Sequence, residues 1–166
     1  MTSIPRLDVF DLATHRRAVH GAVAVADLPR LAESLREATG ELRYELRGHT
    51  DAHRRPAATL RLRGQVVLTC DRCSGPLVHE LASEQGFFFV SDERELEALP
   101  VDPEAQADPL AGSTSFDLAT LVEDEAILAL PMSPRHAVCP AGEAPTVAFE
   151  SAPHPFAALA ALKRRG

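Results

Sequence analysis

The chain has 166 residues, 45% of them hydrophobic and 25% charged, a composition typical of one soluble globular domain and not of a disordered or collagen-like chain. The longest nearly unbroken apolar run, 126–132, is far shorter than the roughly 18 residues that cross a bilayer. Charged residues interrupt segment 1–12, so we expect neither an export signal nor a membrane partner, and a cytoplasmic location. Three cysteines in a reducing compartment leave structural thiols, a metal site or redox chemistry.

Charge is distributed unevenly along the chain. Residues 1–80 hold twelve arginines against ten acids, whereas residues 81–162 hold fourteen acids and two arginines, and Lys163–Arg165 ends the chain with three cations. The acidic middle either serves only to keep the protein in solution or attracts a basic partner.

The first half of the chain predicts one helix and a long antiparallel hairpin. Asp27 is placed to cap an amphipathic helix over 28–39, which Gly40 would end. From residue 41 the hydrophobic period changes to two, which predicts one strand over 41–47 and a second over 60–70.

The second half predicts two more strands and two helices. We expect strands over 77–82 and 87–90, a mobile acidic loop over 91–115 with one helical turn at 93–98, a helix over 118–130 capped by Asp117, a flexible loop over 141–153 and a short terminal helix over 155–165. The expected architecture is a single α+β domain over 1–166, in which two helices cover an antiparallel sheet of about four to five strands.

Two short cysteine motifs have the spacing of metal ligands. Cys70 and Cys73 are separated by two residues, and so are His136 and Cys139. Together they would complete a tetrahedral Cys₃His site for Zn²⁺. Two alternatives stay open: three buried cysteines with an exposed histidine, or redox chemistry at Cys70 and Cys73. Redox chemistry is disfavoured because a strand, not a helix, follows the motif.

One acid and four arginines are further candidates for a structural or binding role. Glu125 falls inside the apolar arc of its helix, so a buried carboxylate there needs either a structural ion pair or a role in anchoring the cysteine turn through Arg72. The polar face of the hairpin carries arginines that could touch a phosphate backbone or could form a salt-bridged, solvated face with Glu41 and Glu45. These arginines are Arg43, Arg47, Arg61 and Arg63.

Sequence blocks at 68–77, 91–100, 116–131 and 154–163 carry a further signal. They include Leu-Thr-Cys-Asp-Arg-Cys-Ser-Gly-Pro-Leu, Phe-Asp-Leu-Ala-Thr-Leu-Val-Glu-Asp-Glu-Ala-Ile-Leu-Ala-Leu-Pro and His-Pro-Phe-Ala-Ala-Leu-Ala-Ala-Leu-Lys. In kind and in order, these blocks resemble the YceD family of large ribosomal RNA subunit accumulation proteins.

The resemblance implies a non-enzymatic ribosome assembly factor that supports accumulation of 23S rRNA and the large subunit, with no small-molecule substrate. The alternative is a zinc- or thiol-dependent regulatory protein unrelated to ribosomes. The direct partner would be 23S rRNA or a basic ribosomal protein of the large subunit. Charge favours the protein, because the acidic loop, with Glu123 and Asp124 on the exposed side of their helix, would attract it.

Overall fold

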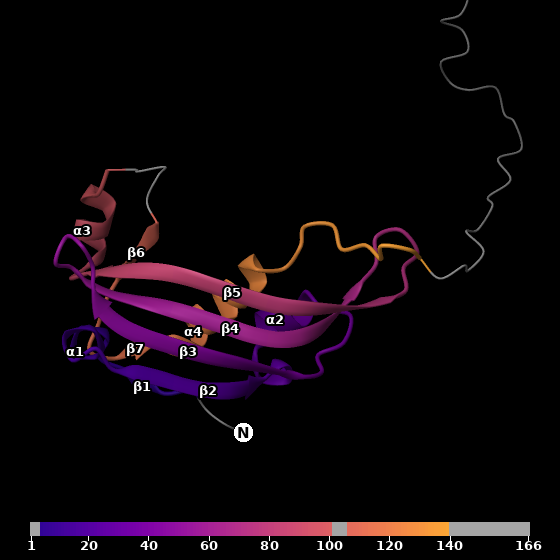
Figure 1. The fold of residues 1–166 in the computed structure, drawn as a ribbon, viewed down its shortest axis with the longest axis horizontal. Coiled ribbons are helices and arrows are strands. Elements are labelled where there is room, and N and C mark those ends of the chain that lie inside the picture. Colours follow the sequence, from indigo (N-terminus) through magenta and orange to yellow (C-terminus); the bar gives the residue numbers. More distant parts are fainter. Residues whose placement is uncertain (1–3, 101–105, 140–166) are drawn as a thin grey trace, which may run out of the picture.

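The computed structural model describes residues 4–100 and 106–139, which form an α+β fold around a five-stranded sheet (Figure 1). The strand order is β2-β3-β4-β5-β6, and a small second sheet pairs β1 with β7. In chain order the elements are β1 (Arg6–Leu7), α1 (Val9–Thr14), β2 (Ala18–Ala24), a 3₁₀ turn (Val25–Asp27), α2 (Pro29–Glu33), β3 (Glu41–Thr50), β4 (Pro56–Thr69), β5 (Pro76–Val90), α3 (Glu93–Ala98), β6 (Ala107–Ala111), β7 (Phe116–Asp117) and α4 (Leu118–Leu128).

The centre of the sheet is the antiparallel ladder of β3, β4 and β5. The predicted alternation is confirmed, because Leu42, Leu46, Leu60 and Leu62 are at most 1% exposed. Their neighbours along the strands point to the opposite face, which the helices α2 and α4 leave uncovered. The sheet therefore has one apolar face turned to the main core. The opposite face is polar except at one end, where Ala57, Phe88 and Val90 form a second small cluster with α3.

The sheet differs from the prediction at three places. One edge of the sheet is β2, a segment for which no strand was expected. Strand β5 is continuous, where two strands over 77–82 and 87–90 were expected. Strand β6 pairs parallel to β5, so the sheet is mixed and the prediction of a wholly antiparallel sheet is wrong at this edge. The predicted mobile loop over 91–115 is wrong for 107–111. Pro109 argued against a strand in the sequence, because proline lacks the N–H that a central strand uses. Proline is tolerated in β6 because β6 is an edge strand.

Helix α2 is much shorter than the predicted helix over 28–39. It ends at Glu33 because the following segment bonds to the sheet: the backbone N–H of Arg36 donates to the carbonyl of Val67 at 2.9 Å, and Glu37 forms a bridge with Val67. Asp27 does not cap it, since Leu28 occupies the N-cap position.

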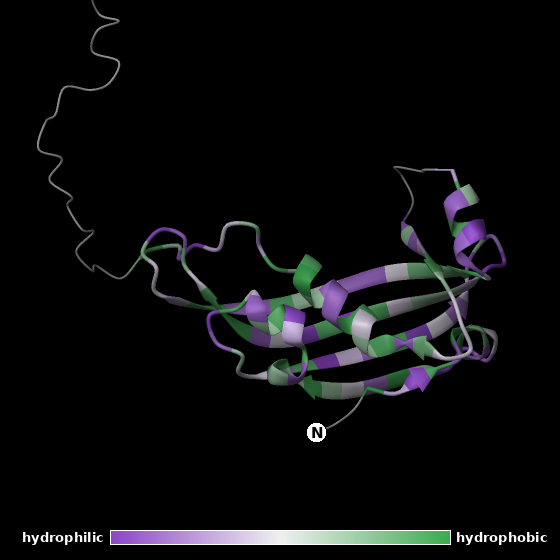
Figure 2. Ribbon diagram, turned by 180° about the vertical axis from the view of Figure 1, so that it is seen from behind, coloured by the Kyte–Doolittle hydropathy of each residue, from purple (hydrophilic) through white to green (hydrophobic). Residues whose placement is uncertain are grey.

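Helix α4 begins as predicted, because the side chain of Asp117 accepts the backbone N–H of Thr120 at 3.1 Å. The predicted helical turn at 93–98 is also confirmed as α3. Helices α2 and α4 lie over the same face of the sheet (Figure 2), but the prediction of two covering helices is met only in part, because α2 has five residues and α1 also packs against β3 and β4. Within the described residues, no helix is long and apolar enough to cross a membrane. The predicted segments 141–153 and 155–165 lie outside the described residues.

Candidate functional site

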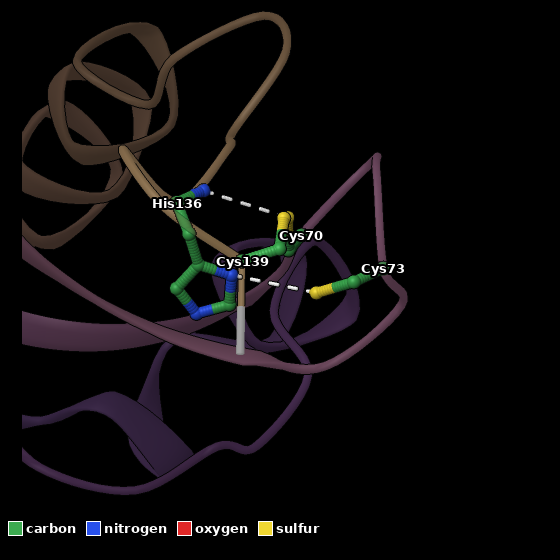
Figure 3. Close-up of side chains that lie close together, drawn as sticks. All are labelled: Cys70, Cys73, His136 and Cys139. Carbon is green, nitrogen blue, oxygen red and sulfur yellow. Dashed lines mark hydrogen bonds between the residues drawn. The ribbon is translucent and has the colours of Figure 1, made fainter. Parts of the chain in front are cut away.

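The four predicted metal ligands meet at the end of the sheet where β4 turns into β5. Cys70 follows β4 and Cys73 lies in the turn, while His136 and Cys139 come from the segment after α4. The three sulfur atoms and one histidine nitrogen all lie within 4.8 Å of one another, and the side chains converge in Figure 3. We call these four residues the Cys₃His cluster.

Hydrogen bonds outside the four side chains join the two segments. The backbone N–H of Asp71 donates to the carbonyl of Pro134 at 2.8 Å. The hydroxyl of Ser133 donates to the carboxylate of Asp71 at 2.7 Å. The turn is closed by a 2.8 Å bond from the N–H of Ser74 to the carbonyl of Cys70. This framework holds the second pair of ligands against the first.

The distances match those around one tetrahedral ion. The sulfurs of Cys70 and Cys139 are 3.9 Å apart, and the sulfur of Cys73 lies 3.5 Å from Nδ1 of His136. Tetrahedral zinc with bonds of about 2.3 Å to sulfur and about 2.0 Å to nitrogen places sulfurs about 3.8 Å apart and sulfur and nitrogen about 3.5 Å apart. The residues present therefore fit Zn²⁺.

The electrostatics favour the thiolate form of one ligand. The backbone N–H of His136, assisted by those of Cys73 and Arg72, lowers the pKa of Cys70 to about 5, although burial opposes the shift. The thiolate is the form that binds metal. At Cys139, burial and the neighbouring sulfurs of Cys73 and Cys70 raise the pKa. A divalent cation among the sulfurs would oppose that increase.

The ring of His136 is oriented by a bond outside the cluster. Its Nε2 lies 3.0 Å from the carbonyl oxygen of Pro76 and can only donate to that acceptor. In the neutral ring, Nδ1, which faces Cys73, is then the unprotonated nitrogen, as a metal ligand requires. Metal-binding histidines commonly use their second nitrogen in this way.

Two other interpretations of the cysteines fit less well. Cys73 is exposed and Cys139 half-buried, so the hypothesis of three buried small side chains fails for them. The motif leads into β5 and not into a helix, so it lacks the helix N-terminus that activates redox cysteines. Four protein ligands would fill a tetrahedral coordination shell, which is characteristic of a structural and not a catalytic zinc site.

The predicted arginine face is assembled, but most of it is neutralised. Arg43 lies opposite Arg63 across the two strands, above a groove of about 640 Å³ that Gly64 also lines. The other arginines lie further along the same face. Three ion pairs occupy this face: Arg43 with Glu41 at 3.8 Å, Arg47 with Glu45 at 2.6 Å, and Arg61 with Glu84 at 3.0 Å.

The predicted exposed pair of acids has a different environment. Glu123 is 6% exposed, so the prediction that it faces solvent is wrong. Its carboxylate accepts the backbone N–H of Arg30 at 2.7 Å and the guanidinium of the same residue at 2.9 Å. Asp124 is partly exposed and also pairs with Arg30, at 2.6 Å. The helical periodicity of the sequence predicted that Glu123 faces solvent, because periodicity does not show that α2 packs on that side of α4.

Glu125 is buried, at 8% exposed. Burial, together with the charges of Asp108 and Asp124, raises its pKa. Among the described residues it forms no ion pair, and the proposed contact with Arg72 is not formed. The expectation of an ion pair at this position is therefore wrong for the part of the chain that the structure describes.

Ligand spacing alone did not reveal the supporting groups. Asp71, Ser133 and Pro76 orient the ligands through bonds that only the folded chain creates. Their sole sequence signal is position, since each lies within three residues of a ligand. Arg30, the partner of two acids, gave no signal beyond its place in a predicted helix.

The fold and the cluster together define a small α+β protein with a Cys₃His cluster that could hold a metal ion. Residues 58–163 match the family described as Large ribosomal RNA subunit accumulation protein YceD. The chain is also 30% identical over 153 residues, covering 87% of both sequences, to the Large ribosomal RNA subunit accumulation protein YceD of Haemophilus influenzae. This chain belongs to the YceD family, and that membership does not favour the regulatory alternative. No solved structure matches it.

Proposed function

We propose that this protein is a non-catalytic assembly factor that supports accumulation of 23S rRNA and of the large ribosomal subunit. Family membership carries the proposal, because the matching family and the Haemophilus influenzae relative are both named for accumulation of large-subunit ribosomal RNA. A closed set of four ligands supports a structural role for the metal, since no coordination position is left for a substrate.

The direct partner is either 23S rRNA or a basic ribosomal protein of the large subunit. Exposed acids on α3, such as Glu93 and Glu97, favour a basic protein. Burial of Glu123 removes one of the two acids expected on the exposed side of α4.

A deletion strain tests the proposed function. We expect the ratio of 23S to 16S rRNA to fall and free large subunits to decline in sucrose-gradient profiles. A plasmid copy of the gene should restore both. Normal 23S levels together with normal subunit profiles in the deletion strain would refute the proposal.

We further propose that Zn²⁺ occupies the Cys₃His cluster as a structural ion. The tetrahedral distances and the lowered pKa of Cys70 support it. Protein purified without chelator should contain about one zinc per chain by elemental analysis. The double variant Cys73→Ser/His136→Ala should contain almost none, whereas His79→Ala, at a histidine outside the cluster, should retain it. Zinc near zero in the unmodified protein would refute the site.

A further inference from the structure

The Cys₃His cluster lies at the end of the sheet opposite α3, where its residues connect two exposed loops (Figure 1). We call residues 70–76 and 133–139 the clamped tip. A backbone hydrogen bond joins Asp71 to Pro134. Arg72 and Arg135 directly follow these two residues, so the two arginines lie on adjacent segments of the chain. Both arginine side chains are exposed. A third, Arg36, reaches the tip by donating to the carbonyl of Ser74 at 2.8 Å.

The arginines of the clamped tip differ from three of the four arginines of the sheet face; Arg63, the fourth, also makes no ion pair among the described residues. Arg43, Arg47 and Arg61 each pair with a glutamate. By contrast, Arg72 and Arg135 make no ion pair with any residue in 4–100 or 106–139. An arginine without an acidic partner keeps its full charge and its planar donor fork for an external anion.

The clamped tip has few carboxylates that could pair with its arginines. Within the two loops, Asp71 is the sole carboxylate, and it accepts the hydroxyl of Ser133 at 2.7 Å. The same region exposes large apolar side chains, with Val138 85% exposed and Met132, just before the second loop, fully exposed. Unpaired cations beside exposed apolar groups are typical of an interaction surface for an anionic partner.

We propose that the clamped tip binds the phosphate backbone of RNA, with Arg72 and Arg135 as the principal contacts. The inference rests on the proposed function, and it selects RNA over a basic protein because arginines without an acidic partner among residues 4–100 and 106–139 would repel the latter. The metal would contribute by fixing the two loops side by side, so that both guanidinium groups face one strand of phosphates. Contacts to phosphate of this kind position an RNA without reading its sequence.

The test measures binding of a 23S rRNA transcript to the full zinc-loaded chain over a series of salt concentrations. We expect Arg72→Ala/Arg135→Ala to weaken binding about tenfold or more at about 0.1 M salt, and to reduce the log–log salt slope by about 2. Arg94→Ala is the matched control, since Arg94 is exposed on α3 at the other end of β5. It should bind as the unmodified protein does. Arg36 is left in place because it supports the turn.

The double variant must keep its zinc content and its unfolding midpoint, which excludes a collapsed tip. Equal binding by the double variant and the unmodified protein would overturn the inference, and so would an equal loss in Arg94→Ala. Retention of a ribosomal protein after ribonuclease treatment, with no binding to the transcript, would overturn it in favour of a protein partner. None of these outcomes requires normal 23S levels in a deletion strain, so failure of the inference is distinguishable from failure of the proposed function.

Discussion

The carboxylate of Glu123 on α4 caps the first turn of α2, where it accepts the backbone N–H of Arg30 at 2.7 Å. The same oxygen lies 3.2 Å from the N–H of Leu31. Helix α2 has no capping side chain of its own, because its N-cap residue is Leu28. A residue from another helix therefore supplies the acceptor that a local Ser, Thr or Asp would ordinarily provide.

This relationship predicts unequal costs for two adjacent acids. Replacing Glu123 by Ala removes the cap and leaves Arg30 without its buried partner, so we expect the free energy of unfolding to fall by about 2 kcal/mol. Asp124→Ala is the matched control and should cost less than about 1 kcal/mol, because that pair is partly exposed. Urea unfolding measures both. Equal costs would show that the capping role of Glu123 is unimportant.

Glu125 predicts a stability change that depends on pH. Because burial raises its pKa above the ordinary value of 4.5, folding favours the protonated acid. Its contribution is fully present below the pKa of the unfolded chain and is lost as the pH rises through the higher folded pKa. Glu125→Gln should therefore stabilise the protein at pH 8 relative to the unmodified chain, and the gain should shrink toward pH 4.

The matched control for that series is Glu84, whose pKa is lowered by the side chain of Arg61. Its effect has the opposite sign, since its contribution is lost as the pH falls. Glu84→Gln should give no gain at pH 8. If Glu125→Gln gave the same difference in stability at pH 4 and pH 8, burial of the charged form would not explain the effect.

Binding of zinc should be linked to the stability of the fold. Because an ion bound only by the folded chain stabilises it, a chelator should lower the midpoint of thermal unfolding by about 5 °C or more. Cys73→Ser/His136→Ala should begin at the lower midpoint and show no response to the chelator. A chelator response of the same size in both proteins would mean that the cluster is not the metal site.

Local pattern predicted some parts of this molecule well and others poorly. The alternation at Leu42 and Leu46 and the cap at Asp117 depend on neighbouring residues, so the sequence was sufficient to locate β3 and the start of α4. The predicted helix over 28–39 was too long, since α2 ends at Glu33. The pairing of Glu37 with Val67, which ends it, joins segments that are far apart in sequence. Tertiary pairing of this kind overrides helical period and propensity.

The candidate site shows the same division. The two-residue spacings singled out all four residues that meet in the Cys₃His cluster, because each pair is close in the linear sequence. The bond between Asp71 and Pro134, which brings the two pairs together, has no counterpart in the linear pattern. The burial of Glu123 was likewise unpredictable, since it depends on where α2 packs.

Complementation of a deletion strain measures whether the protein with an intact Cys₃His cluster supports 23S rRNA accumulation. The ratio of 23S to 16S rRNA is measured in strains carrying the unmodified gene, Cys73→Ser/His136→Ala or His79→Ala, at matched protein levels. We expect the unmodified gene and His79→Ala to restore the ratio, and we expect the cluster variant to leave it low. Full restoration by the cluster variant, or a normal ratio in the deletion strain itself, would contradict this expectation.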